Sequence, residues 1–203
     1  MALSDKLFAH TLAWGDDAQH RLYGARKRRL FAGLSGTVVE IGPGTGVNLP
    51  YLPDGIDWIG LEPNPHIHSY VYEQLAGRGL NATLHTRPAQ DTGLPDNAAD
   101  AVVSTLVLCS VPDLRETFAE LRRILKPGGQ LLFIEHVAAP HDSWLYAVQR
   151  TIRPVWCRVA DGCHPDRDTG AALEAAGFAS VQYEAFRTGL PVVSPHIMGR
   201  ATV

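Results

Sequence analysis

A glycine-rich stretch, Glu40-Ile-Gly-Pro-Gly-Thr-Gly46, is the part of the chain whose residue types and spacing point most directly to chemistry. It ends the β-branched run at 37–41, and ligands of open α/β sheets bind at the carboxyl ends of strands. Glycines let the backbone bend sharply and approach a ligand with no Cβ in between. Glu62 ends the next apolar run, where a carboxylate can accept hydrogen bonds from both hydroxyls of a ribose. The spacing therefore predicts a cofactor that contains a nucleoside.

Two nucleoside cofactors compete for this loop, a nicotinamide dinucleotide and S-adenosylmethionine. The dinucleotide pattern is G-x-G-x-x-G/A, whereas here Gly46 is followed by Val47. Pro43 also removes a backbone N–H that a pyrophosphate site would use. The chain has no Tyr-x-x-x-Lys pair to supply a reductase proton donor, since Arg150 stands four residues after Tyr146. The loop therefore favours the cofactor that carries no phosphate.

Short apolar runs alternate with amphipathic stretches around this loop, a pattern typical of βαβ units and a parallel sheet. Helices are predicted after Asn64, after Asp113 and at 168–176, and the aromatic-bearing segment before 168 is expected to be irregular. The last two strands are only ten residues apart, too few for a parallel crossover. We expect an α/β fold, a Rossmann-like seven-stranded mixed sheet with helices on both faces and an antiparallel final strand pair. The predicted strands are 37–41, 57–61, 83–86, 101–108, 130–137, 180–186 and 197–203.

The segment before the first strand differs from the rest in pattern. Residues 1–34 are expected to form an N-terminal helical cap, and residues 35–203 one domain that holds the cofactor. The run Arg26–Arg29 is interpreted as a solvated helix face, with attraction to an anionic lipid or an acidic partner as the alternative.

Composition excludes several classes of protein. The 203 residues carry a formal net charge of -3, which argues against a general nucleic-acid binder. The longest apolar run, 102–111, is well short of the roughly 20 residues of a membrane span, and Asp5 and Lys6 interrupt any export signal. Three cysteines suit reduced thiols and a cytoplasmic location. No metal site is expected, because Cys157 and Cys163, with His164 adjacent, lack metal-ligand spacing.

These features resemble the class I S-adenosylmethionine-dependent methyltransferases over about residues 38–178. The resemblance rests on the glycine-rich loop, Glu62, Pro88-Ala-Gln90 with Leu94-Pro95, Asp100–Leu106 and Leu125–Gly129. It implies S-adenosyl-L-methionine as cofactor and S-adenosyl-L-homocysteine as product. The cofactor-binding residues that it implies are Glu40, Gly42, Pro43, Gly44, Thr45, Gly46, Asn48, Glu62, Pro63, Ala89, Gln90, Thr105 and Leu106.

A closer resemblance is to the methyltransferase-like protein 7 family of thiol S-methyltransferases. Animal members of that family carry an apolar N-terminal membrane anchor, which this chain lacks, so no integral membrane anchor is expected. The resemblance implies a small-molecule thiol as the methyl acceptor. It is carried by five strings: Leu61–His66, Leu106–Val111, Ile134–Val137, Asp161–Cys163 and Pro195–Gly199.

Methyl transfer asks the protein to hold an acceptor in line with the S–CH₃ bond and to exclude water. His136, at the predicted end of the fifth strand, is the first candidate to orient or deprotonate the acceptor; the alternative is a histidine hydrogen-bonded for packing. Asp161 and His164 are further catalytic candidates on the irregular segment. Cys109 is expected in the core, and Cys163 is not expected to be a covalent nucleophile.

The sequence thus predicts an enzyme that transfers a methyl group from S-adenosylmethionine to the sulfur of a small thiol. The first alternative is O- or C-methylation of an aromatic or quinone-like metabolite. The second is a module that binds the cofactor without turning it over.

Overall fold

A single mixed sheet of seven strands organises the described part of the chain. The structure is a computed structural model that describes the backbone of residues 2–203 and the side chains of residues 14–203. The strand order is β3-β2-β1-β4-β5-β7-β6; β1 to β5 are parallel, and β7 is antiparallel to both neighbours. The antiparallel pairing of the last two strands, β6 and β7, is the one that the sequence predicts. The strands are β1 (Thr37–Ile41), β2 (Asp57–Leu61), β3 (Asn81–His85), β4 (Ala99–Thr105), β5 (Leu125–His136), β6 (Ser180–Arg187) and β7 (Pro195–Thr202).

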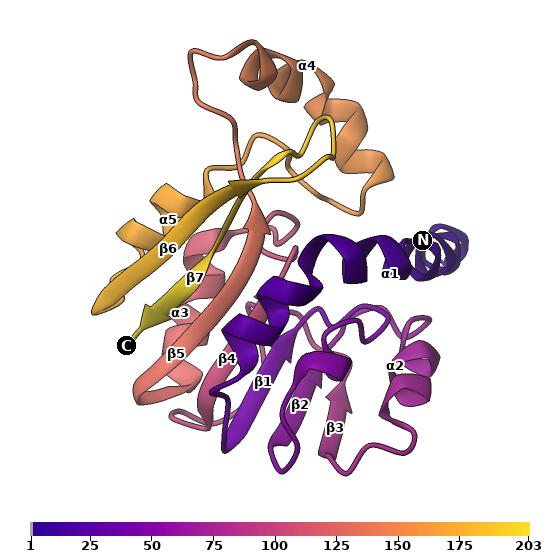
Figure 1. The fold of residues 1–203 in the computed structure, drawn as a ribbon, viewed down its shortest axis with the longest axis vertical. Helices are drawn as coiled ribbons and strands as arrows, with labels where there is room; N and C mark the ends of the chain where they lie inside the picture. The colour runs from indigo at the N-terminus through magenta and orange to yellow at the C-terminus, as the bar shows by residue number, and fades with distance from the viewer. Residues whose placement is uncertain (1) are drawn as a thin grey trace.

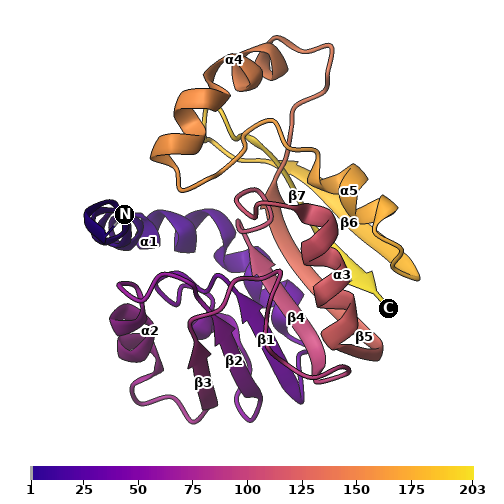
Figure 2. The same ribbon diagram turned by 180° about the vertical axis from the view of Figure 1, so that it is seen from behind.

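Helices cover both faces of this sheet. Helix α1 crosses one face, and α3 and α5 cover the other (Figures 1 and 2). Helix α4 lies beyond the carboxyl end of β5, at the top of Figure 1. The helices are α1 (Ala2–Phe31), the 3₁₀ turn η1 (Leu49–Tyr51), α2 (His68–Leu75), α3 (Leu114–Ile124), α4 (Trp144–Val159) and α5 (Thr169–Ala175).

Local sequence explains several of these elements. The Asp113 carboxylate accepts hydrogen bonds from the backbone N–H groups of Arg115 at 2.7 Å and Glu116 at 3.1 Å, so it caps α3 as predicted. Strands β6 and β7 approach closely at Gly199, where a Cβ would lie 2.1 Å from the carbonyl oxygen of Gln182. The pairing of the last two strands therefore requires glycine at this position.

Each face of the sheet buries an apolar cluster. One lies under α3 and α5 and the other under α1, so the N-terminal helix belongs to the core. No helix within the described residues is both long and apolar enough to cross a membrane. Asp5 and Lys6 lie outside the described side chains. The residues that α1 and the turn after it give to the core are Tyr23, Leu30, Phe31 and Leu34.

Two local expectations are wrong. The segment after β5, expected to be irregular, contains the sixteen-residue helix α4, which begins where the Ser143 hydroxyl accepts a hydrogen bond from the N–H of Tyr146 at 3.2 Å. Helix α2 begins at His68 and not directly after Asn64, because the Asn64 side chain accepts from the N–H of His66 at 3.0 Å and closes a separate turn.

Candidate active site

A pocket of about 450 Å³ opens at the carboxyl ends of β1, β2 and β4. All of the predicted cofactor residues except Glu40 and Gly46 line it, and Asp161 lines it as well. The size lies within the range of small-molecule sites. Residues in its wall that sequence analysis did not identify as cofactor-binding are Gln19, Val47, Leu61, Ile67, Pro88, Val107, Ser110, Val111 and Pro112.

The glycine-rich loop needs its glycines for backbone conformation and for space. Gly42 has φ +53°, and a Cβ there would lie 2.7 Å from Cγ2 of Val107. The N–H of Gly42 donates to the carbonyl of Leu61 at 2.9 Å, which ties the loop to the end of β2. Any larger residue at 42 would therefore strain the loop and push against the pocket wall.

The Glu62 carboxylate lies at the pocket with its two oxygens already oriented. One oxygen accepts from the N–H of Gly44 at 3.2 Å, and the other accepts from the N–H of Asn64 at 2.9 Å. Burial raises the pKa of Glu62, while these two backbone hydrogen bonds oppose the rise. Each oxygen has a further lone pair for a ligand hydroxyl.

Glu40 acts beneath the pocket and does not line it. It is fully buried, and its two oxygens accept from the side-chain N–H groups of Asn48 and Trp58, both at 2.8 Å. Burial raises the pKa of Glu40, and the same two hydrogen bonds lower it. Because Asn48 does line the pocket, Glu40 orients one of its walls.

Helix α1 closes one side of the pocket. Gln19 lines the pocket, and the Asp16 carboxylate accepts a hydrogen bond from the Thr45 hydroxyl at 2.7 Å. Lys27 is fully buried and donates to the carbonyl of Val47 at 3.3 Å; burial lowers the pKa of Lys27 to about 8. The interpretation of the whole basic run as a solvated face is therefore wrong at Lys27. The signal was its spacing of four residues from Tyr23, on the buried side of the helix.

The three predicted catalytic residues have different positions. Asp161 reaches the pocket, from a turn in which it has φ +46°. His136 and His164 do not line it. His164 is half-buried, and burial lowers the pKa of its imidazole. Its backbone N–H donates to the carbonyl of Cys109 at 2.9 Å.

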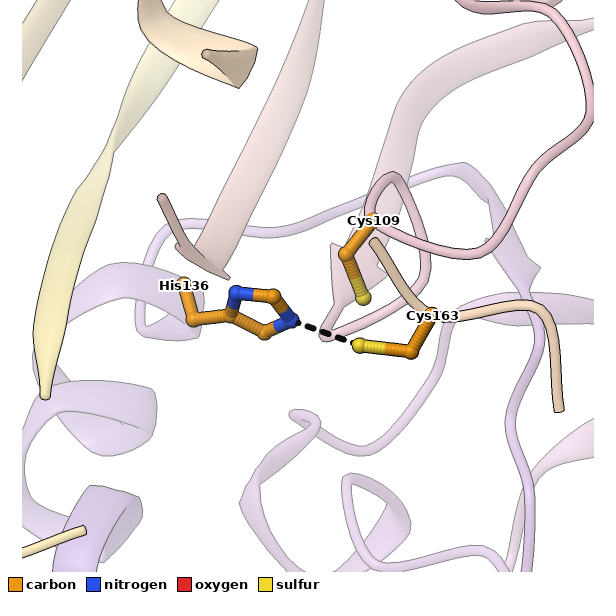
Figure 3. A group of neighbouring side chains, drawn as sticks. All are labelled: Cys109, His136 and Cys163. Atoms are coloured by element: carbon orange, nitrogen blue, oxygen red, sulfur yellow. Dashed lines mark hydrogen bonds between the residues drawn. The ribbon is translucent and has the colours of Figure 1, made fainter. Parts of the chain in front are cut away.

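His136 faces Cys163 instead of the pocket. Its Nε2 lies 3.0 Å from Sγ of Cys163 (Figure 3). The indole N–H of Trp156 donates to the same sulfur at 3.3 Å. Interaction with the buried thiol of Cys109 and these two contacts lower the pKa of Cys163, whereas the pKa of Cys109 is raised. Sequence analysis missed this grouping, because its members are distant along the chain and follow no spacing motif.

Comparison of the chain with known proteins shows the family to which it belongs. Residues 39–133 match the methyltransferase domain family. The chain is 38% identical to the human thiol S-methyltransferase TMT1B over 98% of this chain and 87% of that protein, and 35% identical to human TMT1A over 87% and 78%. The chain belongs to the thiol S-methyltransferase family. It is an S-adenosylmethionine-dependent methyltransferase.

The fold comparison agrees with this assignment. The chain superposes on a methyltransferase from Thermotoga maritima, described as a possible histamine N-methyltransferase, with a TM-score of 0.69 and 19% identity. The match covers 100% of this chain and 99% of that one, and it confirms the predicted class of fold.

Proposed function

We propose that this methyltransferase moves the methyl group of S-adenosylmethionine to the sulfur of a small-molecule thiol. The observation that carries the proposal is the extent of the similarity to TMT1B, which covers 98% of the chain and so includes the segments beyond the methyltransferase domain match. Those segments supply Asp161 and the Cys163 loop beside the pocket. The expected cytoplasmic location and the division of the chain at residue 35 stay predictions.

We assign three parts of the pocket to three parts of S-adenosylmethionine. The glycine-rich loop is open at Gly44, where φ is +57° and a Cβ would meet nothing within 4 Å, so a ligand can approach its backbone, and we assign this loop to the methionine part. We assign the buried carboxylate of Glu62 to the ribose hydroxyls, and Ala89 with Gln90 to the adenine. When bound, the cofactor supplies an electrophilic methyl group on its sulfonium.

The protein's own part is to position the acceptor and to take its proton. Of the three predicted catalytic residues, only Asp161 lines the pocket, so we place its carboxylate at the acceptor as the group that removes the thiol proton. Holding the acceptor in line for attack can supply roughly 7–11 kcal/mol of barrier lowering. His136 contacts Cys163, so it is not the direct base in this proposal.

The test is product analysis with matched acceptors. The purified chain and the cofactor are incubated with thiophenol, phenol and aniline in parallel, and products are identified by mass spectrometry. We expect a methyl thioether and S-adenosylhomocysteine in equal amounts, at a rate that rises as the acceptor thiol ionises. Methylation of phenol or aniline without thiophenol would refute the proposal and favour the alternative acceptor class.

Two variants test the role of Asp161. At a pH below the acceptor's pKa, Asp161→Asn is expected to lower turnover about 10²-fold, and less at a pH where the acceptor is already thiolate. Asp142→Asn, on an exposed position beyond β5, serves as the control and should leave turnover unchanged. An equal loss at all pH values would show that Asp161 does not act as the base.

A further inference from the structure

Three side chains that can bind a metal ion converge beside the pocket. Cys109 lies in the turn after β4, His136 is the last residue of β5, and Cys163 lies in the loop after α4. The two Sγ atoms and a ring nitrogen of His136 all lie within 4.8 Å of one another, and the side chains point toward a common centre (Figure 3). Cys109 and His136 are buried, and Cys163 is half-buried. The fold thus assembles a ligand set that the spacing of Cys157, Cys163 and His164 does not predict.

We infer that Cys109, His136 and Cys163 bind one zinc ion and leave its fourth position for the sulfur of the acceptor. Two thiolates and one imidazole are a ligand set of catalytic zinc sites, in which the remaining tetrahedral position takes water or substrate. Two thiolates also balance the charge of Zn²⁺, which matters for an ion held by largely buried side chains. The zinc site stands on the geometry alone, whereas the role of its fourth position rests on the proposed thiol acceptor.

The observed distances fit an ion with a small adjustment. Nε2 of His136 and Sγ of Cys163 are 3.0 Å apart. Tetrahedral zinc, with bonds of roughly 2.0 and 2.3 Å, would hold these two atoms about 3.5 Å apart. Cys163 is half-buried, and a small rotation of its side chain about χ1 can supply the difference. The N–H of Trp156 already donates to this sulfur, as outer partners of metal-bound thiolates do.

The cluster adjoins the cofactor pocket through its wall. Sγ of Cys109 lies 3.5 Å from the carbonyl oxygen of Leu106 and 3.7 Å from the hydroxyl of Ser110, and both of these residues line the pocket. Asp161, which also lines it, is two residues before Cys163. An acceptor bound through its sulfur to the ion therefore lies next to the pocket that we assign to the cofactor.

Such a site would activate the acceptor by coordination. The thiol R–SH replaces a water molecule on zinc, and its proton is released, by way of Asp161, to solvent, which leaves a zinc-bound thiolate. A sulfur lone pair then forms the new S–CH₃ bond while the electrons of the old C–S bond return to the sulfonium sulfur. The products are a neutral thioether, which is a weak zinc ligand and departs, and S-adenosylhomocysteine.

Cobalt titration of the full chain tests the site without turnover. The reduced, chelator-treated protein is titrated anaerobically with Co²⁺ and then with Zn²⁺. We expect one equivalent of Co²⁺, with visible bands of tetrahedral geometry and sulfur-to-cobalt charge-transfer bands that Zn²⁺ abolishes. Cys109→Ser and Cys163→Ser should lose these bands, whereas Cys157→Ser, outside the cluster, should keep them. The absence of stoichiometric binding, or unchanged bands in Cys163→Ser, would overturn the inference.

The cysteine variants could lose zinc binding because they do not fold, so a further variant tests the site in a folded protein. Trp156→Phe removes the hydrogen bond to Cys163 but keeps an aromatic ring, and it should weaken zinc binding about 10–100-fold while S-adenosylhomocysteine binding stays at the wild-type level. Unchanged zinc affinity in Trp156→Phe, measured in a protein that still binds S-adenosylhomocysteine, would contradict the site.

The role of the fourth position has its own readout. Adding thiophenol to the cobalt-loaded chain without cofactor should shift the charge-transfer bands, and phenol should not. An unchanged spectrum would overturn coordination of the acceptor. Full thiol methylation by zinc-free protein would overturn the role given to the fourth position and leave the proposed function intact. Methylation of phenol alone by a zinc-loaded chain would refute the proposed function and leave the metal site standing.

Discussion

Replacing Glu62 by alanine removes the carboxylate that we assign to the ribose hydroxyls. A hydrogen bond to a charged group contributes about 1.5–3 kcal/mol, so two such bonds correspond to about 3–6 kcal/mol of cofactor binding. That loss is roughly a 10²- to 10⁴-fold rise in the dissociation constant. In the unbound protein the same carboxylate accepts the backbone N–H groups of Gly44, which lines the pocket, and of Asn64, which is half-buried. We therefore expect a smaller loss of folding stability, about 1–2 kcal/mol.

Two measurements on the same samples separate these effects. Calorimetric titration with S-adenosylhomocysteine gives the affinity, and urea unfolding without ligand gives the free energy of unfolding. Glu73→Ala, at an exposed position on α2, is the matched control and should change neither quantity. An affinity for S-adenosylhomocysteine within about threefold of wild type in folded Glu62→Ala would refute the ribose assignment.

Three further predictions concern the loop, the sheet and the buried lysine. Gly42→Ala should weaken S-adenosylhomocysteine binding at least tenfold by calorimetry, since its Cβ would lie 2.7 Å from a side-chain methyl at φ +53°; wild-type affinity would contradict this. Gly199→Ala should lower the free energy of unfolding by at least about 2 kcal/mol, because its Cβ meets a carbonyl oxygen, whereas Gly189→Ala, with open space, should cost less than half as much in the same urea titration. Burial lowers the pKa of Lys27 to about 8, so between pH 8 and pH 10.5 the unfolded chain binds more protons than the folded one, and stability rises with pH. Relative to Lys27→Met, the free energy of unfolding of wild type, measured with urea, should rise by at most about 3 kcal/mol over that range. Parallel plots of this free energy against pH for the two proteins would show that Lys27 is not desolvated.

Strands that form a short, largely buried run with a clear end signal could be predicted well. The bounds of β1 and β2 are the predicted ones, because β-branched or apolar runs there end at glycine or at an acidic residue. Helix α4 could not be predicted in the same way, since Pro154 interrupts its pattern. A distant contact holds it: the buried Gln149 side chain accepts from the N–H of Ala139 and donates to the carbonyl of Val192, at 2.8 and 2.9 Å.

The same distinction applies to the candidate site. The pocket follows from the ends of neighbouring strands, so residues such as Glu62 could be placed from sequence alone. The ligand cluster could not, because His136 stands 27 residues from each of Cys109 and Cys163 in the sequence. The turn after α4 brings Cys163 to the sheet, and no local spacing in the sequence predicts that turn.

The seating of α1 has an evolutionary consequence. Its C-terminal half is embedded in the apolar cluster through Tyr23, Leu30 and Phe31, while Asp16 and Gln19 stand at the pocket. Tilting α1 to admit bulkier acceptors would move its C-terminal half out of this cluster. Broadening of the acceptor range by this route is therefore coupled to loss of stability.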